Sequence, residues 1–205
     1  TVKFSSDHNV RVDSYLRDGL EIPLFYDPMI AKLTVWGKNR NAARLKMIEV
    51  LTNSCLSGIP NNLAFHHYIL RSFDFGAGKI HTNYLNENWE QLSIELGNER
   101  KRFLLLSAAV ARMRLGWHSN HSDLGFRILD QEDDNGLEAL KCALIIDSGG
   151  HHLVITDNDL DLRVELVILD SQEQGMLILH RSQPYFVSME QNEKRFQCNI
   201  GPWNF

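Results

Sequence analysis

The feature that most constrains the fold is an apolar stretch at residues 103–111 (FLLLSAAVA), interrupted by a single serine. It lies in a segment, Glu99–Leu115, that we predict to be one helix, stopped by Gly116. A helix without a polar face must be surrounded by protein on all sides. The stretch has nine residues, whereas a membrane span needs roughly 20. The sequence therefore predicts a central helix enclosed by the rest of its own domain.

The residues after this helix are typical of short antiparallel strands. Their breaks are rich in turn residues, as at Asp133–Gly136 and Ser148–Gly150. We predict strands near 126–129, 137–146, 152–156, 162–169, 176–180, 185–189 and 196–200. Wrapping this meander around the apolar helix covers both elements at once. We expect residues 97–205 to form a long apolar helix inside an antiparallel β-barrel.

The preceding residues mix the two periodicities. They predict strands at 9–16, 22–26 and 29–37, and helices at 39–52, 62–73 and 85–96. The chain is thus expected to be an α+β protein with a mixed α/β domain over residues 1–96. Its domain boundary is predicted to lie between Leu96 and Arg100.

Composition excludes several classes of protein. The net charge is −5 and basic residues are scattered, which argues against a nucleic-acid surface. The three cysteines are far apart in the sequence, which argues against a disulfide framework and favours a reducing compartment. We find no signal peptide and no membrane segment. Because the chain begins with Thr1 and not methionine, we expect it to be part of a longer protein.

Metal and catalytic motifs are weak. The nine histidines include the pairs 66–67 and 151–152, but there is no HExxH. Neighbouring residues point in different directions, so neither pair easily chelates one ion, and we favour surface or partly buried histidines. The acidic run 157–161 resembles a calcium loop but has Leu162 and Ile168 where such a loop needs glycine and glutamate. Phosphate-loop and serine-nucleophile motifs do not occur, so the residues alone do not indicate a self-sufficient enzyme.

Arg11 is the most interesting N-terminal residue. It lies between Val10 and Val12 in an extended run, so the two valines share one face and Arg11 points to the other. An exposed strand arginine is the simpler interpretation. The functional hypothesis is a guanidinium presented to a carboxylate on a ligand or a partner subunit.

Several sequence strings identify a family. Residues 11–14 (RVDS), 26–37 (YDPMIAKLTVWG), Gly58-Ile59, Asn62-Leu63 and 78–85 (GKIHTNYL) resemble, in order and spacing, the C-terminal domain of biotin carboxylase. Residues 99–205 look like the domain that mediates between biotin carboxylase and carboxyltransferase in acyl-CoA carboxylase α subunits, a long helix inside an antiparallel β-barrel. The order of domains resembles the methylcrotonoyl-CoA and propionyl-CoA carboxylase group, whereas a free-standing biotin carboxylase ends near Leu92.

The resemblance implies which parts the chain contributes. In the family, ATP, magnesium and bicarbonate are used by segments that precede Thr1, and biotin is carried on a domain that follows Phe205. We therefore predict no catalytic, cofactor-binding or metal-binding residue in this chain. Arg11 matches an arginine at the biotin carboxylase dimer surface, and Asp27 is a second candidate for that surface. Tyr15 stands where glycine is common, which leaves the local turn open.

Two functional hypotheses follow from the resemblance. In the first, the chain is a piece of a carboxylase α subunit, inactive alone, whose partners are the carboxyltransferase β subunit, the biotin carboxyl carrier domain and a second α subunit. In the second, it is a non-catalytic adaptor whose barrel binds a partner subunit. A barrel that binds a small ligand is disfavoured because the helix fills its interior. The expected location is the bacterial cytoplasm or the mitochondrial matrix.

Overall fold

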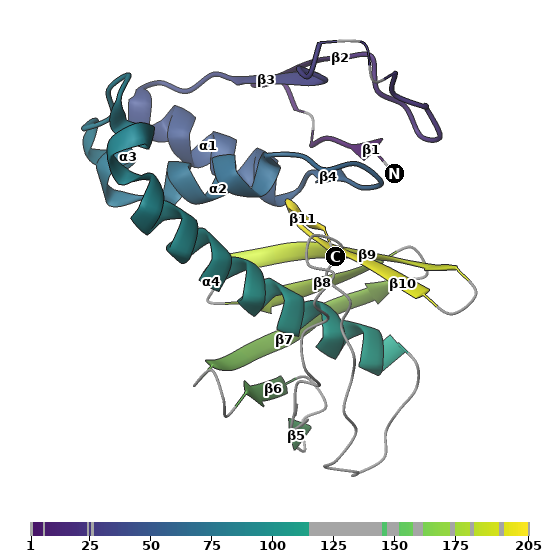
Figure 1. Cartoon of the computed structure of the whole chain (residues 1–205). Coiled ribbons are helices and arrows are strands. Elements are labelled where there is room, and N and C mark those ends of the chain that lie inside the picture. Colours follow the sequence, from purple (N-terminus) through teal and green to yellow (C-terminus); the bar gives the residue numbers. More distant parts are fainter. Residues whose placement is uncertain are drawn as a thin grey trace. The chain divides into compact units, whose positions relative to one another are not determined.

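The computed structural model divides into two compact units, residues 1–96 with 201–204 and residues 97–200. The structure describes residues 2–5, 7–23, 25, 27–114, 145–146, 152–157, 162–172, 175–180, 183–192 and 195–204. Figure 1 shows the described elements, which include both helices and antiparallel strands. The predicted mixture of α and β structure is confirmed.

Helices make up one layer of the first unit. α1 (Arg40–Thr52) begins at Asn39, whose side-chain oxygen accepts a hydrogen bond from the Ala42 amide at 2.8 Å. This bond satisfies one of the backbone amides in the first turn that have no hydrogen-bond partner within the helix. α2 (Leu63–Arg71) packs beside α1 (Figure 1) and is followed by α3 (Phe73–Ala77). α3 ends at Gly78, whose φ of 74° is readily adopted only by glycine.

Two small antiparallel sheets complete the first unit. β1 (Val2–Lys3) pairs with β4 (Cys55–Leu56), and β2 (Val10–Ser14) pairs with β3 (Ala31–Val35). The core of the unit is formed by Leu51, Leu56 and Leu63, against which seven half-buried apolar residues pack: Val2, Leu16, Ile30, Leu33, Met47, Ile59 and Leu70. β3 thus contributes Leu33 to this core.

A close contact joins the end of β3 to α1. A Cβ atom added to Gly37 would lie 2.4 Å from the Ala43 backbone nitrogen. Such a separation is far below van der Waals contact, so only glycine fits here without movement of the backbone. Gly37 therefore lets the segment after β3 pass directly over the first turn of α1.

One predicted strand of the first unit is wrong. Ile22, Pro23 and Phe25, the described residues of the segment 22–26, are not in a strand. Pro23 has no amide to donate to a ladder, and Phe25 is fully exposed. The apolar residues in this segment suggested a strand, but Phe25 has no core to face.

The third predicted helix and the apolar helix are a single element. α4 runs without a break over Tyr84–Arg114. Gly97, which lies between the two predicted helices, is in the helix interior, and a Cβ atom added there would meet no atom within 4 Å outside the helix's own backbone. A glycine inside a helix lowers helix stability by only about 1 kcal/mol relative to alanine. The hydrogen-bonded helical turns on both sides of Gly97 are enough to compensate for this loss. The prediction of two separate helices is therefore corrected.

In the second unit, the apolar part of α4 packs against an antiparallel meander. The side chains of Phe103, Leu104, Leu106 and Val110 are each at most 2% exposed. The Phe103 ring lies edge-on to that of Tyr185, with 5.2 Å between centroids. Ser107, the serine of the apolar stretch, is buried and donates to the Leu104 carbonyl at 2.7 Å. The hydroxyl group of this buried serine therefore has a hydrogen-bond partner within the helix.

The meander follows chain order. Each strand pairs with the next one along the chain. The strands are β5 (Ile145–Ile146), β6 (His152–Asp157), β7 (Leu162–Gln172), β8 (Gly175–His180), β9 (Gln183–Asn192) and β10 (Arg195–Ile200), and β11 (Trp203–Asn204) ends the described chain. A register shift between Ile168 and Asp170 marks an irregularity in β7. Among the described strands the sheet is open, with β5 and β11 at its two edges and no pairing between them that would close a barrel.

Part of the sequence prediction concerns residues outside this description. The predicted strand 126–129 and residues 137–144 of the next one lie outside the described residues, as do His118, His121, His151 and 158–161. In the part that is described, no helix combines the length and the apolar character needed to cross a membrane.

Candidate functional site

The outward face of the β2–β3 sheet carries the first predicted site residue. In the antiparallel register Arg11 lies opposite Thr34, and Asp13 lies opposite Lys32. These four side chains are exposed, whereas Val10 and Val12 on the other face are half-buried. The predicted separation of the valines from Arg11 is therefore confirmed. The face presents two cations and one carboxylate to its surroundings.

Arg11 is held by a neighbour on its own strand. Its Nε donates to a carboxylate oxygen of Asp13 at 2.9 Å. Both residues point to the same side because they are two apart in a strand. This hydrogen bond raises the pKa of the Arg11 guanidinium. Since the side chain is 76% exposed, the pair is solvated and contributes little to stability. Arg11 is thus oriented but remains accessible to a carboxylate or another anion.

Asp27 has a local role in the chain. Its Oδ1 accepts a hydrogen bond from the Met29 amide at 2.8 Å, which is the geometry of an Asx turn. This turn leads the chain into β3 through Ile30, a residue packed on the core. Asp27 is exposed. The structure does not join Arg11 and Asp27 in an ion pair, because each is bonded within its own segment.

Large apolar side chains are exposed on the same segment of the chain, and sequence reasoning did not identify them. Trp36 is 68% exposed, Met29 65% and Tyr15 46%. Trp36 continues the alternation of β3 on the side of Lys32 and Thr34. The period-2 pattern that placed Arg11 could therefore have placed Trp36 on the outward face. Exposed aromatic residues beside charged ones are typical of contact surfaces.

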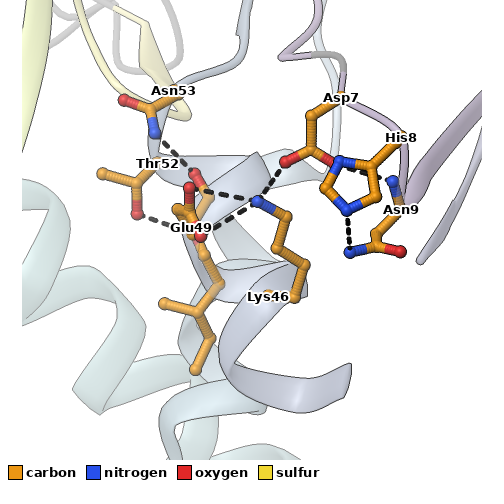
Figure 2. A network of polar contacts seen from close by, with 8 residues as sticks. Asp7, His8, Asn9, Lys46, Glu49, Thr52 and Asn53 are labelled. Atoms are coloured by element: carbon orange, nitrogen blue, oxygen red, sulfur yellow. Dashed lines mark hydrogen bonds and ion pairs between the residues drawn. The ribbon is translucent and has the colours of Figure 1, made fainter. Parts of the chain in front are cut away.

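A polar network links the turn before β2 to α1 (Figure 2). The ammonium group of Lys46 contacts the Asp7 carboxylate and lies 3.2 Å from both carboxylate oxygens of Glu49. Lys46 lowers the pKa of Asp7, chiefly through their hydrogen bond, and Asp7 raises the pKa of Lys46. The other oxygen of Asp7 accepts from the Asn9 amide at 2.8 Å. One aspartate thus bonds both a helix and the turn that begins β2.

The adjacent histidines of α2 have different environments. His66 is exposed, whereas His67 is 1% exposed and lies against Thr52. The Thr52 hydroxyl donates to the Ile48 carbonyl at 2.8 Å and is 3.1 Å from Nε2 of His67. Because the single hydroxyl proton is used, Nε2 must be the donor in the second bond. Burial lowers the pKa of His67 to about 3, so this side chain is a neutral core histidine.

Metal binding finds no support in the part of the chain that is described. Among those residues, no group of three or more His, Cys, Asp or Glu side chains could hold an ion. Gly76 lies within α3 and Gly78 caps it, so these glycines end a helix. A phosphate cradle needs the opposite order, with the glycines leading into a helix N-terminus.

Comparison with known proteins assigns the N-terminal part. The family described as biotin carboxylase C-terminal domain matches residues 1–87. The match covers less than half of the chain. The predicted resemblance is therefore confirmed for this segment. The structure explains parts of the matching strings, since Asp27 forms the turn before β3, Leu33 enters the core and Gly78 caps α3.

Curated relatives agree with this assignment. The chain is 35% identical over 89 residues to the mitochondrial methylcrotonoyl-CoA carboxylase subunit alpha of Glycine max, covering 43% of this chain and 12% of the relative. It is 35% identical over 109 residues to the mitochondrial propionyl-CoA carboxylase alpha chain of Caenorhabditis briggsae, covering 52% and 15%. It is 35% identical over 78 residues to a biotin carboxylase of Nostoc, covering 38% and 17%. The matched chain spans less than a fifth of each of these relatives.

Proposed function

We propose that this chain is part of the α subunit of a biotin-dependent acyl-CoA carboxylase. Its biotin carboxylase C-terminal domain would help build the catalytic domain that carboxylates biotin at the expense of ATP. The observation that carries the proposal is the match of residues 1–87 to this domain family. The names of the relatives, two carboxylase α subunits and a biotin carboxylase, support it.

The proposed contribution of these residues is scaffold and contact surface. ATP, magnesium, bicarbonate and carrier-bound biotin would be handled by other segments of the assembly. We expect the 205-residue chain alone to show no bicarbonate-dependent cleavage of ATP.

Residues 97–205 are proposed to dock the carboxyltransferase β subunit. Support comes from the packing of the apolar half of α4 on an antiparallel meander, which is the arrangement expected of a mediating domain. Closure of the meander into a barrel, using the predicted strands 126–129 and 137–146, is part of this proposal. The biotin carboxyl carrier domain is the other proposed partner. The mitochondrial names of two relatives suggest the matrix, and the Nostoc relative a bacterial cytoplasm.

A chimera tests the catalytic part of the proposal. Residues 1–87 would replace the matching segment of the Nostoc biotin carboxylase, and carboxylation of free biotin would be measured with ATP and bicarbonate. We expect the chimera to retain activity, because the grafted residues carry the same core and turn contacts. A chimera that is folded by circular dichroism but inactive would contradict the proposal.

Arg11 is proposed to contact a second α subunit, with Asp27 as a further contact. In the chimera, Arg11→Glu reverses the charge beside Asp13 and should shift sedimentation toward the monomer, while Lys32→Glu serves as the matched change on the neighbouring strand. The same proteins would be assayed for activity. If Arg11→Glu abolishes carboxylation and leaves sedimentation unchanged, Arg11 serves the reaction and is removed from the interface.

The docking role is tested with purified β subunits. The 205-residue chain should co-elute in gel filtration with the carboxyltransferase β subunit of a methylcrotonoyl-CoA or propionyl-CoA carboxylase. The Nostoc biotin carboxylase, expected to lack a mediating domain, is the control and should elute separately. Co-elution combined with an inactive chimera would favour the adaptor hypothesis. Failure to co-elute with both β subunits would contradict the docking role.

A further inference from the structure

The sheet that presents Arg11 is weakly anchored to the core of its unit. It has two strands, and such a sheet is marginally stable without further packing. β3 places Leu33 among the residues that pack on the core of Leu51, Leu56 and Leu63. No β2 residue is among the described side chains packed on that core. Val10 and Val12 are only half-buried, so polar contacts contribute a larger share in fixing the position of β2.

The turn before β2 supplies such an anchor. Asp7 accepts hydrogen bonds from two amides of this turn, through its carbonyl oxygen from Val10 at 3.0 Å and through Oδ1 from Asn9 at 2.8 Å. The Asn9 carbonyl in turn accepts from the Trp36 amide at 3.0 Å, which adds a bond beyond the paired residues of β2 and β3. Asp7 thus determines where β2 begins, four residues before Arg11.

The connection from this turn to the helix layer is Lys46. Its ammonium group bonds the second carboxylate oxygen of Asp7 (Figure 2). The Lys46 side chain is 20% exposed and the Asp7 side chain 37% exposed. Glu49 holds the same ammonium from within α1 but is itself 58% exposed. Lys46 therefore lies between a helical carboxylate and the carboxylate of the turn. Because Lys46 is partly covered while Asp7 is exposed, solvent screens this pair somewhat less than a pair with two fully exposed partners.

We propose that Lys46 is a positioning residue for β2, and that its bond to Asp7 sets how Arg11 is presented on the outward face of the sheet. The inference rests on the proposed function only in treating Arg11 as a contact residue. Two points then fix the sheet on α1, the close approach of Gly37 at the end of β3 and the Lys46–Asp7 pair at the start of β2. Without the second point, β2 is held only by its ladder to β3 and by the half-buried Val10 and Val12.

Hydrogen exchange of the 205-residue chain, followed by NMR, tests this proposal without any partner. In Lys46→Gln we expect the Val10 and Trp36 amides to exchange about twofold to fivefold faster, since the pair no longer holds the turn. The Arg11 Nε–H signal should shift in the same variant. The Asn53 amide, bonded to the Glu49 carbonyl at 3.1 Å, is the internal reference and should be unchanged.

Three further variants separate positioning from general destabilisation. Lys46→Arg restores the cation and should restore the slow exchange of Val10 and Trp36. Asp7→Asn removes the charge but keeps an oxygen for the Asn9 amide, so it should reproduce Lys46→Gln even if that variant folds poorly. Glu49→Gln removes only the pair within the helix and should leave Val10, Trp36 and Arg11 as in the wild type.

The results distinguish this inference from the proposed function. Unchanged exchange of Val10 and Trp36 in Asp7→Asn and in folded Lys46→Gln would overturn the positioning role. Equal acceleration of Asn53 would also overturn it, because the effect would then be general. If exchange responds as expected but Arg11→Glu leaves sedimentation of the chimera unchanged, Lys46 still positions β2, and only the role assigned to Arg11 fails.

Discussion

Burial of His67 predicts a pH dependence of stability that can be calculated from its surroundings. The side chain is 1% exposed, donates to Thr52 and has its pKa lowered to about 3, first by burial and then by the charge of Arg71. In the unfolded chain its pKa returns to about 6.5. The unfolded state therefore binds more protons at any pH between about 3 and 6.5. The contribution of neutral His67 to stability is complete above pH 6.5 and decreases as the pH falls through this window.

The magnitude at pH 5 depends little on the folded pKa. With pKa values of about 6.5 and about 3, the linkage relation gives a loss of about 2 kcal/mol between pH 8 and pH 5. A folded value of about 4 gives nearly the same loss, because the folded-state histidine is neutral at pH 5 in both cases. The expected loss of stability at pH 5 therefore depends on His67 being buried and neutral, and not on the exact value of its folded-state pKa.

The assay compares wild type with His67→Gln by urea unfolding at both pH values. Glutamine can donate to Thr52 but does not titrate. The stability advantage of the wild type should therefore shrink by about 2 kcal/mol from pH 8 to pH 5. His66→Gln, on the exposed side of α2, is the comparison. Desolvation lowers the pKa of His66 as well, but its shift is smaller than that of His67, so this substitution should change the difference less. A constant difference between wild type and His67→Gln would refute the assignment of His67 as a neutral core residue.

Two further predictions concern the backbone. Gly37→Ala should destabilise the first unit by about 1–3 kcal/mol, because the new Cβ meets the Ala43 nitrogen; thermal melting measures this, with Gly97→Ala as the matched control. Gly97→Ala should instead raise the stability by about 1 kcal/mol, since it lies in α4 with no neighbour around it, and a lowered melting temperature would contradict a continuous helix. Asn39→Ala removes the cap of α1 and should cost about 1 kcal/mol; Asn39→Asp, which keeps a capping oxygen, should retain most of the stability, and an equal loss in both would argue against the cap.

Local patterns predicted much of the first unit. The alternation around Arg11 placed β2 and its outward face, and Asn39 marked the start of α1, because both depend on residues close in sequence. The segment 22–26 was predicted wrongly because apolar residues indicate a strand only if a partner and a core exist. The two separate helices at 85–96 and 99–115 were predicted wrongly because the periodicity of each segment does not show whether the helix continues between them.

The candidate site shows the same division. Arg11 and Asp27 were found from a strand pattern and a family string, and their exposed positions agree with a surface role that is still to be tested. Trp36 follows from the same alternation and could have been found. Lys46 could not, since its partner Asp7 is 39 positions earlier in the chain and nothing in either segment indicates the other.

The amino-acid sequence alone was enough to predict the class of structure, the apolar character of the helix after residue 99 and the resemblance of residues 1–87 to the biotin carboxylase C-terminal domain. These follow from composition, period and local strings, which are properties of neighbouring residues. Three features could be seen only in the folded chain: His67 is buried while His66 is exposed, Lys46 bonds the turn before β2, and Gly37 lies on α1. Those facts depend on which segments pack together, because desolvation, ion pairing and close approach arise between residues distant in the chain.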